Sequence, residues 1–344
     1  MAKYETHFIP QNKLFDNYIG VYDGEKLVGK VKTGALKMPA LGNKLYSFGA
    51  LADVHVIANT YSDTKFRKAL DYLNNTEKVA FTCIAGDLTG TGTAEQFENY
   101  KEAVEAYSPN VPVYEITGNH DCQDPTVAPF LTLESTKQYT RSDLYYSFTH
   151  GNDLFIMFGM SGWSAYTGTI FTHGQLQWLY ETLEANRNKR CFVFEHCPRF
   201  DGSGKVAGWK DPTGNLLMGD EGECFKSLMS HYKNVTWFHG HSHMEFQYQE
   251  HDPKVNYDNL FGCHSVHIPS LAEGRELNAD GTGYIFTTAE SSGYVVDVYE
   301  NHIVLRGRDF VVDKFVPIAT YYLDTTLQTI EPNTFTDSTG TITT

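Results

Sequence analysis

The sequence lacks cysteine pairs and an excess of basic residues, and each absence excludes a class of protein. Its six cysteines are scattered and none forms a C-x-x-C pair, which argues against a zinc ribbon or a thioredoxin-like site. Lysine and arginine total 27 against 42 acidic residues, a formal net charge of -15. Long nucleic acids need a basic surface, so this charge disfavours them. Small phosphorylated substrates stay compatible, because bound cations reverse the local field.

Long apolar segments are also missing. No apolar run reaches the ~18 residues of a membrane span. The chain begins MAKYETH and shows no apolar signal core there, so a cytoplasmic location is the default expectation. Carriage on a phage particle needs no signal and stays open. The sequence leaves the oligomeric state undetermined.

Three segments differ in character. Residues 1–45 hold two β-rich runs around Asp23-Gly24, which predicts an accessory β-hairpin segment packed on the core. Residues 46–318 form the predicted core domain. Residues 319–344 are rich in threonine and poor in core-forming side chains, which predicts an extension or linker.

Within the core domain, short apolar runs alternate with segments of helical period. This pattern is typical of βαβ units around a largely parallel sheet, and a later run at 293–310 predicts an antiparallel hairpin. The predicted strands cover 46–54, 79–85, 111–116, 153–159, 190–195 and 234–239, and the predicted helices cover 62–74, 93–107, 173–186 and 221–231. The glycine-rich stretch 199–222 is the longest gap between elements, and loops of this length are usually functional or disordered.

Polar side chains cluster at the carboxyl ends of five predicted strands. The clusters are Asp53-Val54-His55, Gly86-Asp87, Gly118-Asn119-His120-Asp121, His196 and Gly240-His241-Ser242-His243. In open α/β sheets ligands bind at this edge, and the glycines let the backbone turn so that the next side chain faces the cleft. Asp53 and His55 are expected on one side of their strand, because residues i and i+2 share a face.

The clusters hold the ligand types of a metal site. Two aspartates, one asparagine and four histidines, with His120 left over, exceed the roughly four ligands of a single zinc and suit two metals with Asp87 as the bridge. Mixed oxygen and nitrogen ligands favour manganese, iron, zinc or cobalt over calcium or magnesium. Paired metals are a common device for in-line displacement at phosphorus.

These five blocks, in this order, resemble the calcineurin-like metallophosphoesterase family. The resemblance implies an α/β fold, a four-layer α/β/β/α sandwich of two mixed β-sheets flanked by helices. It implies two divalent or trivalent transition-metal ions (Mn, Fe or Zn) between the sheets, with a hydroxide between them that attacks phosphorus. One metal would be held by Asp53, His55, Asp87 and His243, and the other by Asp87, Asn119, His196 and His241.

His120 and Asp121 are the expected catalytic residues. By the resemblance, His120 lies near the phosphate and either stabilises charge or protonates the leaving oxygen. Many family members carry a second aspartate, in Gly-Asp-x-x-Asp, that orients this histidine, whereas this chain has Gly90 there. Asp121 or a backbone carbonyl would then orient His120, or His120 is less tightly held. Arg199 is either a bidentate phosphate ligand or a solvated loop residue.

The predicted function is hydrolysis of a phosphomonoester or phosphodiester, most simply of a small phosphorylated substrate. The alternative is a structural module of a larger phage or cell-surface assembly that binds a phosphate polymer and retains the metal site. His239, His264 and His267 are more typical of packed structural residues than of ligands. The substrate and the metal identity are not readable from the sequence.

Overall fold

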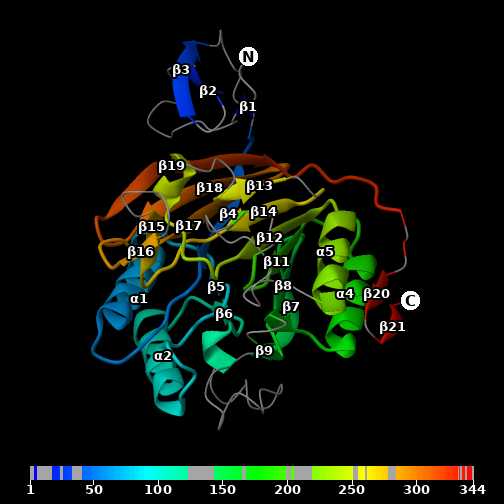
Figure 1. Ribbon diagram of the computed structural model, residues 1–344, viewed down its shortest axis with the longest axis horizontal. Helices are drawn as coiled ribbons and strands as arrows, with labels where there is room; N and C mark the ends of the chain where they lie inside the picture. The colour runs from blue at the N-terminus through cyan, green and yellow to red at the C-terminus, as the bar shows by residue number, and fades with distance from the viewer. Residues whose placement is uncertain are drawn as a thin grey trace.

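The computed structural model describes residues 4–5, 18–23, 26–32, 41–122, 143–164, 168–198, 203–204, 219–250, 255–259, 262–277, 284–331, 333, 335–337 and 339–342. Two six-stranded sheets lie face to face with a pair of helices outside each (Figure 1). The expected four-layer α/β/β/α sandwich of two mixed sheets is therefore confirmed. Arg199 and most of the stretch 199–222 lie outside the described residues.

The first large sheet contains the opening strand of the core. Its order is β19 (Lys314–Asp324), β18 (His302–Asp309), β17 (Ser292–Tyr299), β4 (Lys44–Leu51), β5 (Thr82–Ile84) and β6 (Val113–Glu115). Strands β4, β5 and β6 are parallel, whereas β17, β18 and β19 are antiparallel. The carboxyl ends of the three parallel strands thus lie at one edge, and the predicted hairpin at 293–310 is confirmed as β17 and β18.

The second large sheet faces the first. Its order is β13 (Tyr257–Asp258), β14 (His264–His267), β12 (Val235–His239), β11 (Cys191–Phe194), β8 (Asp153–Phe158) and β7 (Tyr145–His150). The four central strands are parallel, and the two edge strands are antiparallel to their neighbours. A second set of parallel strand ends is therefore available to a site between the sheets.

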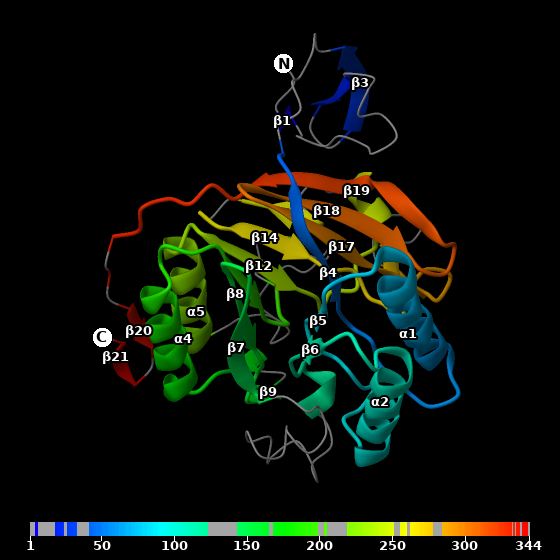
Figure 2. The same cartoon turned by 180° about the vertical axis from the view of Figure 1, so that it is seen from behind.

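Helices cover the outer face of each sheet (Figure 2). The first sheet carries α1 (Tyr61–Asp71), which continues into a π-helix (Tyr72–Glu77), and α2 (Ala94–Tyr107), and the second carries α4 (His173–Ala185) and α5 (Gly219–His231). The predicted start of α2 is confirmed, because the Thr93 side chain accepts a hydrogen bond from the Gln96 amide. A capping box of Thr172 and Gln175 begins α4. No helix in the described part of the chain is long and apolar enough to cross a membrane.

The remaining elements are short. Separate small sheets are formed by β1 (Tyr4–Glu5), β2 (Tyr18–Asp23) and β3 (Lys26–Lys32), by β9 (Gly162–Ser164) and β10 (Gly168–Ile170), by β15 (Gly274–Leu277) and β16 (Tyr284–Thr287), and by β20 (Phe335–Asp337) and β21 (Gly340–Ile342). Two 3-10 helices span His120–Cys122 and Phe246–Glu250. The hairpin expected near Asp23 is present as β2 and β3.

Three apolar cores fill the spaces between the four layers. The core between the sheets is aromatic: the Phe48 ring stacks on Phe81 at 5.5 Å and meets Phe155 edge-on at 5.3 Å. A second core joins α1 and α2 to the first sheet, where Phe66 stacks on Tyr100 at 5.3 Å. The third joins α4 and α5 to the second sheet. Close-packed rings on both sheets fix their relative position, and with it the strand ends that carry the polar residues.

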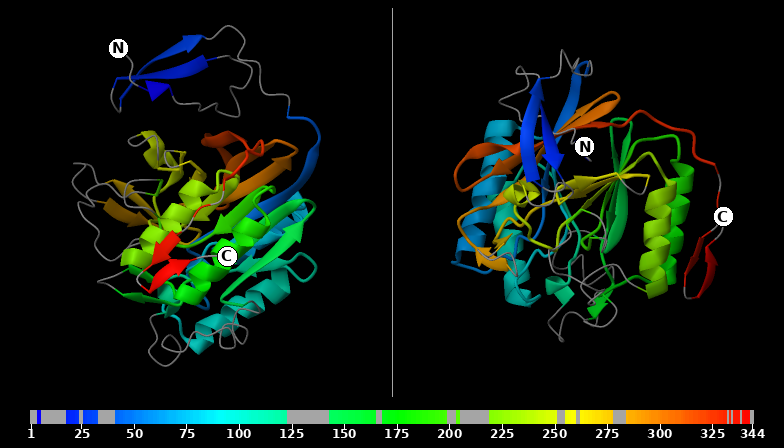
Figure 3. Two further views of the ribbon diagram at one scale, coloured as in Figure 1. Left: turned by 90° about the vertical axis from the view of Figure 1, so that its right-hand side faces the viewer. Right: turned by 45° about the horizontal axis from the view of Figure 1, so that its top comes forward.

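The C-terminal segment differs from the expected linker in two ways. Strand β19 runs from Lys314 to Asp324, across the boundary expected after residue 318. Beyond it, Ile330 and Phe335 are buried in the core of α4 and α5, and the β20–β21 hairpin lies against these helices (Figure 3). The expectation that this segment lacks core-forming residues is therefore wrong, because two well-spaced apolar side chains suffice to dock it.

Candidate metal centre

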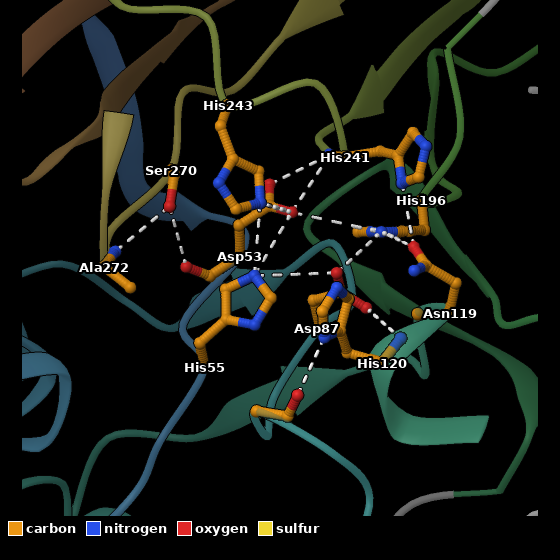
Figure 4. A network of polar contacts seen from close by, with 12 residues as sticks. Asp53, His55, Asp87, Asn119, His120, His196, His241, His243, Ser270 and Ala272 are labelled. Atoms are coloured by element: carbon orange, nitrogen blue, oxygen red, sulfur yellow. Dashed lines mark hydrogen bonds and ion pairs between the residues drawn. The ribbon is translucent and has the colours of Figure 1, made fainter. Parts of the chain in front are cut away.

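All seven predicted ligands meet at the carboxyl ends of strands from both sheets (Figure 4). Asp53 and His55 follow β4, Asp87 follows β5, Asn119 follows β6, His196 follows β11, and His241 and His243 follow β12. Three loops of one sheet and two loops of the other therefore form the site. It lies where the two sets of parallel strand ends face each other.

The backbone at the site is unusual. Five of the ligands have a left-handed conformation, with φ of 52° at Asp53, 46° at His55, 52° at Asp87, 71° at His241 and 59° at His243. Each such residue costs roughly 1–3 kcal/mol and persists only where the surrounding structure enforces it. The expectation that one strand face aligns Asp53 and His55 is wrong, because β4 ends at Leu51 and the left-handed turns bring these side chains together.

Backbone hydrogen bonds hold the two loops of the first sheet side by side. The Asp53 amide donates to the Gly86 carbonyl at 3.1 Å, and the His55 amide donates to the Asp87 carbonyl at 2.9 Å. The amides of Leu271 and Ala272 and the Ser270 hydroxyl donate to carbonyls of Ala52 and Asp53 from the other side. These hydrogen bonds hold the left-handed turns at Asp53 and His55 in place. Ser270, which the sequence reading missed, also follows a strand end, that of β14.

One group of potential ligand atoms comes from Asp53, His55, Asp87 and His243. Their atoms all lie within 4.8 Å of one another. The Nε2 atom of His243 is 3.1 Å from Asp53 Oδ1 and 3.1 Å from His55 Nε2, and His55 Nε2 is 3.6 Å from Asp87 Oδ2. Two imidazole nitrogens and two carboxylates thus point at a common centre.

A second group comes from Asp87, His196 and His241. His196 Nε2 lies 3.3 Å from Asp87 Oδ2, and the Asn119 side-chain oxygen lies 3.1 Å from His196 Nε2 and 2.8 Å from His241 Nδ1. His196 is oriented from behind by a 2.7 Å hydrogen bond from Nδ1 to the Ala85 carbonyl, which leaves Nε2 to face the site. Asp87 belongs to both groups and is the residue able to bridge two ions.

The site holds two buried carboxylates, Asp53 and Asp87, which need positive charge nearby. Asp53 and Asp87 are 0% and 1% exposed, and among the described residues neither pairs with a lysine or an arginine. Burial opposes the ionised Asp53, yet the charge interactions with His243 and His196 outweigh it and hold the Asp53 pKa below its usual range. Buried carboxylates of this kind are stable only when paired or bound to metal. The donor set therefore fits two cations.

The histidines differ in protonation. Burial lowers the pKa of His55 to about 3, and burial with the charge of His196 lowers that of His241 to about 3. For His196, burial also acts against the charged form, but the Asp87 and Asp53 carboxylates raise its pKa to about 10. A proton on His196 thus balances part of the negative charge in the metal-free chain. A metal ion would take its place, because a ligating imidazole must be neutral.

Comparison with known proteins agrees with this geometry. Residues 46–245, more than half of the chain, match the family described as calcineurin-like phosphoesterase. The chain belongs to the calcineurin-like phosphoesterase family. Family membership and the two ligand groups together support a metal-dependent phosphoesterase in general terms.

Individual relatives resemble the chain more distantly. The human serine/threonine-protein phosphatase CPPED1 is 28% identical over 144 residues, which is 39% of this chain and 44% of that protein, so the match spans under half of the relative. GAP50, described as the anchor in the inner membrane complex of Plasmodium, aligns with a TM-score of 0.52 at 12% identity over 84% of this chain and 91% of its own. Vps29 from Cryptosporidium parvum aligns with a TM-score of 0.40 at 13% identity, covering 82% and 100% of the chains.

His120 of this calcineurin-like phosphoesterase lies beside the ligand groups. Its Nδ1 atom is 2.7 Å from the Gly90 carbonyl, and since a carbonyl only accepts, Nδ1 carries the proton. Its backbone amide donates to Asp87 Oδ1 at 2.8 Å, and its ring meets the His55 ring edge-on at 4.6 Å. Of the open alternatives, the structure therefore selects a backbone carbonyl as the group that orients His120.

Asp121 is buried behind the site and serves the backbone. Its carboxylate accepts hydrogen bonds from the amides of Leu88, Thr89 and Gly118 at 2.8–3.0 Å and from the Thr89 hydroxyl at 2.7 Å. Burial and the charge of Asp87 raise its pKa to about 6. Asp121 thus ties the loops after β5 and β6 together, and none of these hydrogen bonds involves the His120 ring.

The other histidines singled out by the sequence support the structure. His239 lies within β12, and its Nε2 contacts the hydroxyls of Ser203 and Ser265 at 2.9 and 3.1 Å. His267 Nε2 is 3.3 Å from the hydroxyl of Ser242, the residue between His241 and His243. Their expected structural role is confirmed, and His267 also steadies the loop that carries two ligands.

Five of the seven predicted ligands, His55, Asp87, Asn119, His241 and His243, line a cavity of about 460 Å³. Other wall residues come from α1 and its preceding loop, from β9, and from β15, the residue before it and β16, and they include Tyr61, Trp163, Glu273, Arg275 and Phe286. The sequence reading missed these wall residues, because they belong to no motif and three of them lie more than 25 residues beyond the last cluster.

Proposed function

We propose that this chain is a dinuclear metal-dependent phosphoesterase that hydrolyses a phosphomonoester or phosphodiester of a small molecule. The supporting observation is the shared position of Asp87 in two groups of ligand atoms. The mixture of carboxylate, amide and imidazole donors suits Mn, Fe or Zn. The cavity above the groups is within the size range of small-molecule sites.

The protein residues would divide the work. Asp53, His55 and His243 would hold one ion, Asn119, His196 and His241 would hold the other, and Asp87 would serve both. When bound, such a pair supplies Lewis-acid chemistry: it polarises the phosphoryl group and lowers the pKa of water so that a hydroxide nucleophile is available. His120, fixed at Nδ1 by the Gly90 carbonyl, presents Nε2 toward the cavity. Protonated there, it donates a proton to the leaving oxygen.

Substitution of the shared ligand tests this proposal. In Asp87→Asn we expect metal content and hydrolysis of nitrophenyl phosphate to fall together, because a neutral amide is a poor bridge between two cations. Metal is measured by mass spectrometry after reconstitution with Mn, Fe or Zn, and turnover on monoester and diester panels. The matched control is Asp71→Asn, an exposed carboxylate at the end of α1.

Two results would contradict the proposal. Full turnover by a chelated, metal-free sample would exclude metal catalysis. Two tightly held metal ions without turnover on any ester would favour the alternative, a phosphate-binding module that retains its metal site.

A further inference from the structure

A buried lysine of α1 is bound to the loop that supports the metal centre. Lys65 is 6% exposed, and its ammonium donates to the backbone carbonyls of Ala272 and Glu290 at 2.5 Å each. Burial lowers the pKa of this ammonium. Moving a charged group out of water costs free energy, and an apolar side chain would fill the same space without that cost. Packing alone therefore does not explain a lysine at this position.

Ala272 connects Lys65 with the predicted ligand Asp53. The Ala272 carbonyl accepts from the Lys65 ammonium, while the Ala272 amide donates to the Asp53 carbonyl at 3.1 Å. The Ser270 hydroxyl donates to the same Asp53 carbonyl at 3.1 Å and accepts from the Ala272 amide at 3.2 Å (Figure 4). One short segment, residues 270–272, thus lies between the ammonium and the backbone of a metal ligand.

The backbone of Asp53 determines where its carboxylate points. Asp53 has a left-handed φ of 52°, a conformation that persists only where neighbouring groups hold it. Its Oδ1 atom lies 3.1 Å from Nε2 of His243, within the group of ligand atoms that His55 and Asp87 complete. A rotation of the turn would move this carboxylate away from the other three ligands. Support of the Asp53 carbonyl is therefore support of the whole group.

Helix α1 holds the supporting loop at a second point. The Tyr61 hydroxyl donates to Glu273 Oε2 at 2.9 Å, and Tyr61 lies four residues before Lys65, on the same face of the helix. The Lys65 ammonium lies 5.3 Å from the centre of the Tyr61 ring. Its other acceptor, the Glu290 carbonyl, belongs to the segment between β16 and β17. Lys65 thus joins α1 to two loops beside Asp53.

The second group of ligands is held by other contacts. His196 is oriented by the Ala85 carbonyl, and the Asn119 oxygen lies between His196 and His241. Within the part of the chain that the structure describes, no hydrogen bond joins Lys65 or the segment 270–272 to the side chains of His196 and Asn119. A change at Lys65 should therefore act on one ion more than on the other.

We propose that Lys65 is a positioning residue: through Ala272 it holds the turn at Asp53, and it thereby sets the affinity for the ion on that side of the centre. This inference rests on the proposed function for the presence of two ions. The hydrogen bonds of Lys65 go to the main chain, so its effect on the ligands passes through the backbone. Changes to such supporting groups typically weaken metal binding about 10- to 100-fold.

Replacement of the ammonium tests this link. Lys65→Met keeps most of the side-chain length and removes the charge and its donors. Binding of Mn to the chelated full chain is measured by calorimetry, and mass spectrometry counts the bound ions. We expect wild type to bind two ions, and the variant to bind one of them about 10-fold more weakly while the other stays within twofold. Lys65→Arg, which keeps a charge and donors, should restore part of the lost affinity.

Ligand variants identify the ion that responds. In His241→Ala the remaining ion is that of the Asp53 group, and adding Lys65→Met should weaken it about 10-fold. In His243→Ala the remaining ion is the other one, and adding Lys65→Met should change its affinity less than about twofold. The control is Lys68→Met, on the same helix, an exposed lysine whose ammonium also donates to a backbone carbonyl, that of the turn after β18.

Unfolding measurements separate positioning from general stability. Urea unfolding of the chelated proteins gives the free energy of unfolding of each variant without ions. Selective weakening of one ion supports the inference whatever the change in that free energy. Equal weakening of both ions, or unchanged affinities in folded Lys65→Met, overturns it. If Lys65→Met does not fold, Lys65→Gln carries the same comparison.

The proposed function is decided separately. If wild type binds two ions but hydrolyses no ester, the hydrolase assignment fails, whereas selective weakening in Lys65→Met still establishes the positioning role. If wild type hydrolyses esters and Lys65→Met binds both ions as tightly as wild type does, the hydrolase stands and the positioning role fails.

Discussion

At the scale of single residues, a backbone carbonyl orients His120, the residue proposed to act as the general acid. Gly90 has no carboxylate, and a side chain there would meet Ile57, since a Cβ atom would lie 2.8 Å from Ile57 Cδ1. The Gly90 carbonyl takes over the orienting bond to His120. A neutral acceptor fixes the tautomer of His120 but adds no full negative charge beside it.

His120→Ala should therefore keep the metal ions and lose rate. We expect kcat to fall about 10²- to 10⁴-fold for esters with alkyl leaving groups, which need a proton, and much less for nitrophenyl esters. Steady-state kinetics on both ester types, with metal content by mass spectrometry, measures this; His302→Ala at the start of β18 is the control. An equal loss on both ester types would indicate charge stabilisation in place of proton donation.

The sequence reading located the seven convergent site residues for a physical reason. Ligand chemistry restricts them to a few residue types, and the strand pattern places each at the same sheet edge. No comparable sequence pattern marks Gly90, which contributes its backbone carbonyl. None marks the cavity-wall residue Arg275 either, because it lies in a short strand more than 25 residues after the last cluster. Such residues are recognisable only once the fold places them.

At the scale of elements, most strands and helices were predictable, whereas the end of β4 beside the site was not. Short apolar runs located β4, β5, β6, β8, β11 and β12, because strands buried on both faces are apolar throughout, and helical periods located the four main helices. The end of β4 was placed three residues late, at 54 instead of Leu51, since left-handed turns at Asp53 and His55 follow from neighbouring loops and not from local preference.

The C-terminal hairpin was missed because only two apolar side chains, Ile330 and Phe335, are buried in the α4–α5 core. Phe335 packs against Tyr180 at 5.6 Å, His231 at 5.5 Å and Tyr232 at 6.4 Å. Phe335→Ala should lower the free energy of unfolding by about 3 kcal/mol and leave hydrolysis unchanged, as the site lies elsewhere. Urea unfolding compares it with Thr336→Ala, its exposed neighbour. Identical unfolding curves for Phe335→Ala and Thr336→Ala would mean that the segment behaves as the undocked linker that its composition predicts.

At the scale of the whole molecule, the candidate metal centre draws its ligands from both sheets. Asp53, Asp87 and Asn119 come from loops of the first sheet, whereas His196, His241 and His243 come from loops of the second. Ions bound by both sets would bind the folded chain and not the unfolded one. Metal binding would therefore stabilise the folded chain, and it would hold the two sheets together.

His196 makes this stability depend on pH in the metal-free protein. Its pKa is raised to about 10 in the folded chain by the nearby carboxylates, above the ordinary value of 6.5. The folded chain keeps a proton that the unfolded chain releases in this range. The stabilisation is therefore complete below pH 6.5 and is lost as pH rises toward 10, by an amount on the order of a few kcal/mol.

A chelated sample should accordingly lose stability from pH 6.5 to 9.5, while a Mn-loaded sample should not lose this contribution, because its His196 Nε2 binds metal in place of a proton. Urea unfolding at several pH values measures both slopes. Glu195, whose pKa burial raises to about 8, adds a decline of the same sign, so chelated His196→Gln is the reference that isolates the histidine. Equal slopes for chelated wild type and His196→Gln would show that a proton on His196 does not stabilise the metal-free fold.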